Sequence, residues 1–185
     1  MGAPGSRSEV AVKRWLKKIA IALVVVLVGG TAVGYVLQER RDARILADNP
    51  PPGRFVDVGG HELHYRLFGE GPVTFVLEAG GGEYGATWEE IEEELARLGG
   101  VFVYDRAGLG WSEEGPHPRT IERIVEELHA ALDGADVPPP YVLVGHSLGG
   151  AVATFYAMKH PERVAGLLLV DPSHQDQVRE MPQPP

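Results

Sequence analysis

Apolar and polar positions divide the chain into one long apolar stretch near its start and a series of shorter apolar runs after it. From residue 19 to residue 37, nineteen consecutive residues carry no charged side chain. A helix of that length covers about 28 Å, close to the thickness of the hydrocarbon layer of a membrane. The pattern therefore predicts a transmembrane helix over residues 19–37.

Basic residues flank this apolar stretch, and more of them stand before it than after it. Arg7, Lys13, Arg14, Lys17 and Lys18 precede it, and Arg40, Arg41 and Arg44 follow it. Since Lys and Arg are enriched on the cytoplasmic side of spanning helices, the N-terminus is expected in the cytoplasm and the body outside. A cleaved secretory signal shows the same basic and apolar order, so secretion after cleavage is the alternative, and a buried soluble helix is a third interpretation.

After residue 53, short apolar runs alternate with amphipathic segments. Two mixed runs joined by Gly59-Gly60 predict an antiparallel hairpin over residues 54–58 and 62–68. Later strands are predicted at 73–77, 101–104, 141–144 and 164–170, and helices at 87–98, 120–135 and 148–159. Unbroken apolar strands separated by amphipathic helices indicate an α/β fold, an open and mostly parallel sheet with helices on both faces.

The first predicted helix has the clearest amphipathic pattern. Thr87 is expected to be its N-cap, and the early glutamates suit the positive end of the helix dipole. Its expected buried face consists of Trp88, Ile91, Leu95 and Leu98, and its expected outer face of Glu89, Glu90, Glu92, Glu93 and Glu94.

These patterns give the chain five expected parts. They are a basic cytoplasmic N-terminus (1–18), a transmembrane anchor (19–37), a linker (38–53), an α/β body (54–176) and a disordered tail (177–185). The linker ends in Asp48 to Gly53, where consecutive prolines fix φ and prevent a helix.

Charge and composition exclude several functions. Residues 1–53 carry 8 basic and 4 acidic side chains, whereas residues 54–185 carry 9 basic and 22 acidic ones. A body this acidic does not attract phosphate backbones, so no nucleic acid partner is expected. The chain has no cysteine, which excludes disulfides, thiolate metal sites and a cysteine nucleophile. His61, His64, His117 and His129 lack metal-ligand spacing, so no metal is expected, nor any cofactor.

One motif follows the predicted strand at 141–144. Gly145-His146-Ser147-Leu148-Gly149-Gly150 matches G-x-S-x-G, with a buried strand before it and a helix after it. A serine on such a strained turn needs very small neighbours two positions away, and Gly145 and Gly149 meet that need. The following helix then directs its free N–H groups and positive dipole at a developing oxyanion.

With this motif, the chain resembles the α/β-hydrolase fold family, in the branch with a Gly-His-Ser-Leu-Gly-Gly elbow. Residues 105–112 are similar to the D-x-R-G-x-G-x-S loop of that branch, displaced by one residue. Residues 141–147 and 168–172 are similar to its usual strand ends. The resemblance covers residues 54 to about 176. It implies an esterase-like hydrolase acting on a small ester-like molecule.

The resemblance also assigns roles to single residues. It implies that Ser147 is the nucleophile and forms the acyl-enzyme, and that the backbone N–H of Leu148 contributes to the oxyanion hole. In the family the second donor follows an earlier strand in a loop that often begins His-Gly. Here that loop reads Ala79-Gly80, which makes Gly81 the implied donor. His146 adjoins the nucleophile and is expected to form local hydrogen bonds.

The acid and the base are where this sequence departs from the family. The family order is Ser, acid, His, with a cap region and two further strands in between, whereas 38 residues follow Ser147 here. We therefore expect a C-terminally truncated hydrolase domain that ends after its sixth strand. Asp171 and His174 are the remaining candidates for acid and base, and a plain strand-end carboxylate and a solvated loop histidine are the alternative interpretations.

Two functional hypotheses follow from these patterns. The first is a membrane-anchored serine hydrolase; a serine at position 147, rather than an aspartate, argues against dehalogenase and epoxide-hydrolase chemistry. The second is a non-catalytic fragment or a binding module whose open sheet edge recruits a partner strand. A complementing chain that supplies the other half of the domain is a further possibility.

Overall fold

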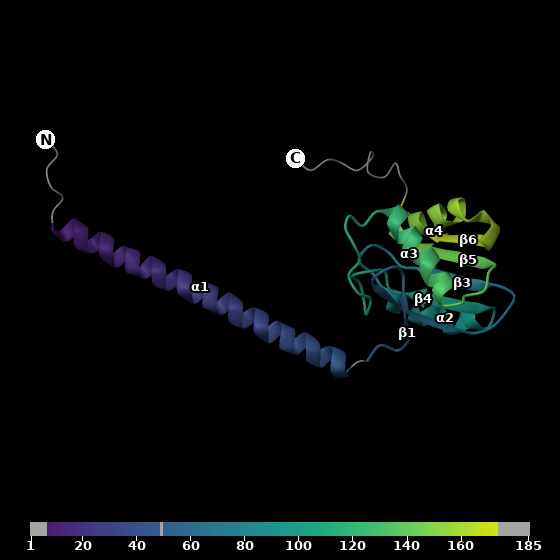
Figure 1. Ribbon diagram of the computed structural model, residues 1–185, viewed down its shortest axis with the longest axis horizontal. Helices are drawn as coiled ribbons and strands as arrows, with labels where there is room; N and C mark the ends of the chain where they lie inside the picture. Colours follow the sequence, from purple (N-terminus) through teal and green to yellow (C-terminus); the bar gives the residue numbers. More distant parts are fainter. Residues whose placement is uncertain (1–6, 49, 174–185) are drawn as a thin grey trace. The chain divides into compact units, whose positions relative to one another are not determined.

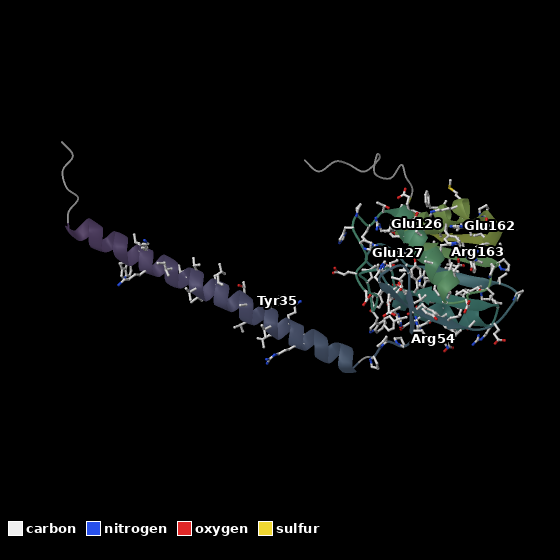
Figure 2. All side chains as sticks on the ribbon, in the orientation of Figure 1. Tyr35, Arg54, Glu126, Glu127, Glu162 and Arg163 are labelled. Atoms are coloured by element: carbon white, nitrogen blue, oxygen red, sulfur yellow. The ribbon has the colours of Figure 1, made fainter. Side chains whose placement is uncertain are left out.

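The computed structural model describes residues 7–48 and 50–173, in two compact units divided between Pro50 and Pro51. The first unit is helix α1 (Arg7–Asp48) (Figure 1). Its segment Trp15–Gln38 has a mean hydropathy of 2.4 and is long and apolar enough to cross a membrane. Tyr35 and the other described apolar side chains of this segment are exposed around the helix (Figure 2). A signal sequence near an N-terminus can meet the same criteria of length and hydropathy, so α1 is compatible with either interpretation.

The second unit contains a six-stranded mixed sheet with the strand order β1-β2-β4-β3-β5-β6. Its strands are β1 (Arg54–Asp57), β2 (Glu62–Phe68), β3 (Thr74–Glu78), β4 (Gly100–Tyr104), β5 (Tyr141–His146) and β6 (Val164–Val170). The pairs β1–β2 and β2–β4 are antiparallel, and the remaining pairs are parallel. The expected hairpin and the expected block of parallel strands are therefore both present.

Helices cover both faces of this sheet. They are α2 (Glu89–Ala96), α3 (Ile121–Gly134) and α4 (Leu148–Lys159), with short 3₁₀ helices η1 (Gly85–Trp88) and η2 (Pro161–Arg163). Apolar residues of α3 and α4 pack with one set of strand side chains, which includes Phe102. Trp88 and Leu95, from η1 and α2, pack with the alternate set, which includes Val103. Because side chains of a strand alternate between its faces, these two clusters lie on opposite sides of the sheet.

The start of α2 differs from the expectation. The helix begins at Glu89 after a 3₁₀ turn, and Thr87 provides no cap. Ile91 and Leu98 are exposed, whereas Glu92 is buried, which reverses the expected pattern at these three positions. The reason is an ion pair, because Arg66 on β2 donates to Glu92 at 2.7 Å through Nη1 and neutralises the carboxylate under the helix.

Strand β6 forms one edge of the sheet in the part of the chain that the structure describes, as expected, and β1 forms the other. It pairs with β5 along one side. Four consecutive apolar side chains, Leu167 to Val170, are each between 40% and 54% exposed. A strand of this composition at a sheet edge offers unpaired backbone groups next to uncovered apolar surface.

Candidate active site

Ser147 lies on the sharp turn that joins β5 to α4. Its backbone has φ 50° and ψ −119°, a conformation that residues with a Cβ rarely adopt. The turn is fixed on both sides, because the Ser147 N–H donates to the Val170 carbonyl at 3.1 Å and Gly150 N–H donates to the Ser147 carbonyl at 3.0 Å. The Ser147 residue is half-buried. A strained, partly accessible serine between a central parallel strand and a helix is the geometry of a nucleophile elbow.

Backbone strain at Ser147 can be measured as a difference in the free energy of unfolding between two variants. We expect Ser147→Gly to have a free energy of unfolding about 1 kcal/mol higher than Ser147→Ala, because glycine adopts positive φ without steric cost. Equilibrium urea unfolding followed by tryptophan fluorescence would measure the difference. Equal stabilities of the two variants would show that the turn holds no strain.

Glycines allow α4 to start directly against the backbone of neighbouring segments. A Cβ on Gly145 would lie 2.5 Å from the Gly149 carbonyl oxygen. A Cβ on Gly149 would lie 2.5 Å from the Ala79 carbonyl oxygen and closer still to that of Glu78. Distances below 3.0 Å are essentially never seen for real Cβ atoms, so both positions require glycine. The close contact brings the helix N-terminus up to the loop that follows β3.

The two expected oxyanion donors lie next to each other. Leu148 is the first residue of α4, so its N–H has no acceptor within the helix. Gly81 belongs to a turn after β3, which the Glu83 N–H closes by donating to the Gly80 carbonyl at 3.2 Å. A Cβ placed on Gly81 would meet the Leu148 side chain at 3.7 Å. Among the described residues, the N–H groups of Leu148, next to Ser147 in the chain, and of Gly81, on the adjoining turn, therefore have no backbone acceptor.

His146 is tied to this same turn. Its Nδ1 lies 3.0 Å from Glu83 Oε2, and that oxygen also accepts the Gly80 N–H at 2.8 Å. The hydrogen bond from His146, followed by that from Gly80, lowers the pKa of Glu83. As expected, His146 hydrogen-bonds locally, and it links the elbow to the turn that carries Gly81. Glu83 was not singled out from the sequence, and nothing in its local pattern marked it.

A buried polar cluster, which the sequence did not predict, holds the backbone that leads into the turn after β3. Arg106 donates from Nη1 to the Ala79 carbonyl at 2.7 Å and from Nη2 to the Gly80 carbonyl. Its Nη1 lies 3.4 Å from Glu78 Oε2, and the other oxygen of that carboxylate, Oε1, accepts a hydrogen bond from the Tyr104 hydroxyl. Glu78 is fully buried, and this burial raises the pKa of its carboxyl to about 7. A glutamate that ends an apolar strand was the signal in the sequence.

Asp105 organises the loop after β4. It lies 3.0 Å from His64 Nδ1 and accepts the N–H groups of Gly85 at 2.8 Å and Trp111 at 3.0 Å. Both Asp105 and His64 are buried. These contacts give the loop at 105–112 a structural role.

Asp171, the residue expected as the acid, makes no hydrogen bond to Ser147 among the described residues. Asp171 is exposed at the end of β6, and within residues 7–48 and 50–173 its carboxylate makes no ion pair or hydrogen bond with a histidine. His174 lies outside the described residues. Ser173 contacts Ser147, with its N–H on the Ser147 carbonyl at 2.9 Å and its Oγ 3.5 Å from Ser147 Oγ. Among the described residues, no three His, Asp or Glu side chains cluster as a metal site requires.

The fold and this site define the class of the protein. Residues 73–184 match the family model of the alpha/beta hydrolase fold. The chain belongs to the α/β-hydrolase family.

Particular relatives include esterases. The chain is 39% identical over 116 residues to the protein YqjL of Bacillus subtilis, covering 63% of this chain and 45% of YqjL. It is 39% identical over 108 residues to a pimeloyl-[acyl-carrier protein] methyl ester esterase of Vibrio campbellii, covering 58% of this chain and 40% of that enzyme. A solved thermophilic esterase from Thermogutta terrifontis superposes with a TM-score of 0.59 at 30% identity, over 64% of this chain and 45% of the esterase. The chain therefore spans less than half the length of these relatives.

Proposed function

We propose that this protein is a serine hydrolase that cleaves small-molecule esters through an acyl-enzyme on Ser147. The observation that carries the proposal is the position of Ser147, half-buried on a turn with positive φ between β5 and α4. The neighbouring N–H groups of Leu148 and Gly81 support it, because acyl transfer needs donors where negative charge develops. The relatives described as esterases favour an ester as the substrate.

The proposed reaction has two half-reactions. Ser147 Oγ attacks the ester carbonyl carbon while its proton passes to a base, and the two N–H groups stabilise the resulting oxyanion. The intermediate collapses with loss of the alcohol, which takes up that proton, and water then hydrolyses the acyl-enzyme by the same route. We propose His174 as the base and Asp171 as the acid that orients it, with a histidine from a complementing chain as the alternative. His146 is not proposed for this role, because among the described residues its ring makes no hydrogen bond to Ser147 Oγ.

We further propose that α1 anchors the protein in a membrane. The apolar segment Trp15–Gln38 supports a span, and the greater number of basic residues before it supports a cytoplasmic N-terminus with the body outside. In this arrangement residues 38–53, helical as far as Asp48, form the connection to the hydrolase domain.

Covalent labelling with a fluorophosphonate probe tests the proposed function. We expect the folded protein to take up one label, since the probe reacts with activated serines. Peptide mass spectrometry would locate the label on Ser147 among the five serines of the chain. A folded sample that stays unlabelled, or one that is labelled on Ser173, would contradict the proposal.

A second candidate function is a binding module that pairs with another strand through β6. The exposure of Leu167 to Val170 on the edge strand favours it. This candidate predicts that the protein is folded but takes up no fluorophosphonate label. It also predicts that a strand partner or a complementing chain co-purifies with the protein from its membrane. The labelling experiment therefore separates the two functions.

A further inference from the structure

The Arg106 guanidinium lies directly under the peptide that carries Gly81, and the proposed reaction does not use it. One of its nitrogens donates to the Gly80 carbonyl, and the other donates to the Ala79 carbonyl at 2.7 Å. Arg106 is 6% exposed. A planar guanidinium that binds two consecutive carbonyls fixes both position and direction of this backbone in a way that a single point charge does not.

The orientation of the Gly81 N–H follows from the geometry of the peptide bond. The Gly80 carbonyl accepts hydrogen bonds from Arg106 and from the Glu83 N–H, at 3.2 Å for the latter. A trans peptide points its N–H opposite to its carbonyl. The Gly81 N–H therefore points away from the buried guanidinium, on the side of the turn that is exposed and adjoins Leu148.

The guanidinium is itself held from the sheet. Glu78, at the end of β3, lies 3.4 Å from Arg106 Nη1 through Oε2, and Tyr104 on β4 donates to the other Glu78 oxygen. Both partners are buried, at 0% and 3% exposure. Because an unpaired polar group in a buried site is costly, these contacts favour one position of the guanidinium.

We infer that Arg106 is a positioning residue that aims the Gly81 N–H at the oxyanion, with Glu78 and Tyr104 holding Arg106 in place. The inference rests on the proposed function in naming Gly81 as an oxyanion donor. It goes further by assigning the reactivity of Ser147 to a charged group that touches neither the serine nor the substrate.

The test removes both charges together, because deleting Arg106 alone would leave Glu78 buried without a counter-charge. The variant is Arg106→Met with Glu78→Gln. The matched control is Arg119→Met with Glu127→Gln, which removes another partly buried pair, joined at 2.6 Å through Nη1, that makes no hydrogen bond to residues 79–83. All variants are made in the full chain and studied in detergent micelles.

Two readouts are taken on each variant. The first is the ¹⁵N–¹H resonance of Gly81 and its hydrogen-exchange rate, which report the orientation and fixation of this amide without any catalysis. The second is the rate at which a fluorophosphonate labels Ser147. We expect the Arg106 variant to shift the Gly81 resonance, to exchange that amide faster and to slow labelling by about 10- to 100-fold, since a single oxyanion donor is typically worth 10²–10³ in rate. The control is expected to match the wild type in both readouts.

The outcomes separate the inference from the proposed function. An unchanged Gly81 amide in the folded Arg106 variant, or labelling as fast as in the wild type, overturns the inference and leaves the proposed function standing. A wild type that takes up no label contradicts the proposed function, and the Gly81 resonance then decides by itself whether Arg106 positions the turn. Slower labelling in the control as well would show a general loss of stability and would also overturn the inference.

Discussion

Ser147→Ala is expected to lower the rate of ester hydrolysis by at least about 10⁴-fold, because no acyl-enzyme forms without the hydroxyl oxygen and only binding and the oxyanion donors remain. Hydrolysis of a short-chain p-nitrophenyl ester by the full chain, followed as release of nitrophenolate, would measure the loss. The folded state should be unaffected, since alanine keeps the same Cβ on the same turn.

Ser173→Ala is the matched control for this experiment. Its hydroxyl lies 3.5 Å from that of Ser147, but Ser173 follows β6 and does not stand on the turn at the start of α4. We expect this variant to retain hydrolysis within about threefold of the wild type. Activity that survives Ser147→Ala and disappears with Ser173→Ala would show that Ser173 is the nucleophile and would contradict the proposed role of Ser147.

Gly149→Ala is expected to reduce the free energy of unfolding by about 3 kcal/mol, at the upper end of the usual cost of overpacking. The added methyl would overlap the Glu78 carbonyl oxygen and lie 2.5 Å from that of Ala79. Both contacts are backbone atoms at the end of β3, which cannot move aside without disturbing the sheet. Equilibrium urea unfolding compared with the wild type would give the difference.

Gly166→Ala is the control for overpacking. Gly166 lies in β6, where an added Cβ would meet the nearest atoms, those of Val142, at 3.8 Å, an ordinary contact distance. This variant is expected to stay within about 0.5 kcal/mol of the wild type, since surface substitutions without strain have effects of that size. A Gly149→Ala variant as stable as Gly166→Ala would mean that α4 does not press against β3.

Local sequence patterns were sufficient for most of the fold. The apolar runs gave the parallel strands, and α4 and β6 have the predicted bounds, because glycines mark the start of α4 and Pro161 follows its end. The predicted buried face of α2 was wrong at Glu92 for a reason that lies elsewhere in the chain. Glu92 turns inward since Arg66, 26 residues earlier, reaches it from β2.

In the candidate site, too, local sequence patterns predicted some features and missed others. The motif placed Ser147 at a strand-to-helix junction, and the structure has it there, with Gly81 close to Leu148. The residues beneath that turn were missed. Glu78 and Arg106 are far apart in sequence, and they meet because β3 lies beside β4 in the sheet, an order that no local pattern reveals.

The closed arrangement of Glu78 and Arg106 has an evolutionary consequence. A substitution at either position leaves the partner's charge buried without a counter-charge. Substitutions at these two positions are therefore expected to occur together rather than independently. Lineages that exchange one residue for a neutral side chain should exchange the other as well. In an aligned set of relatives the two columns would then covary, although neither residue touches the substrate.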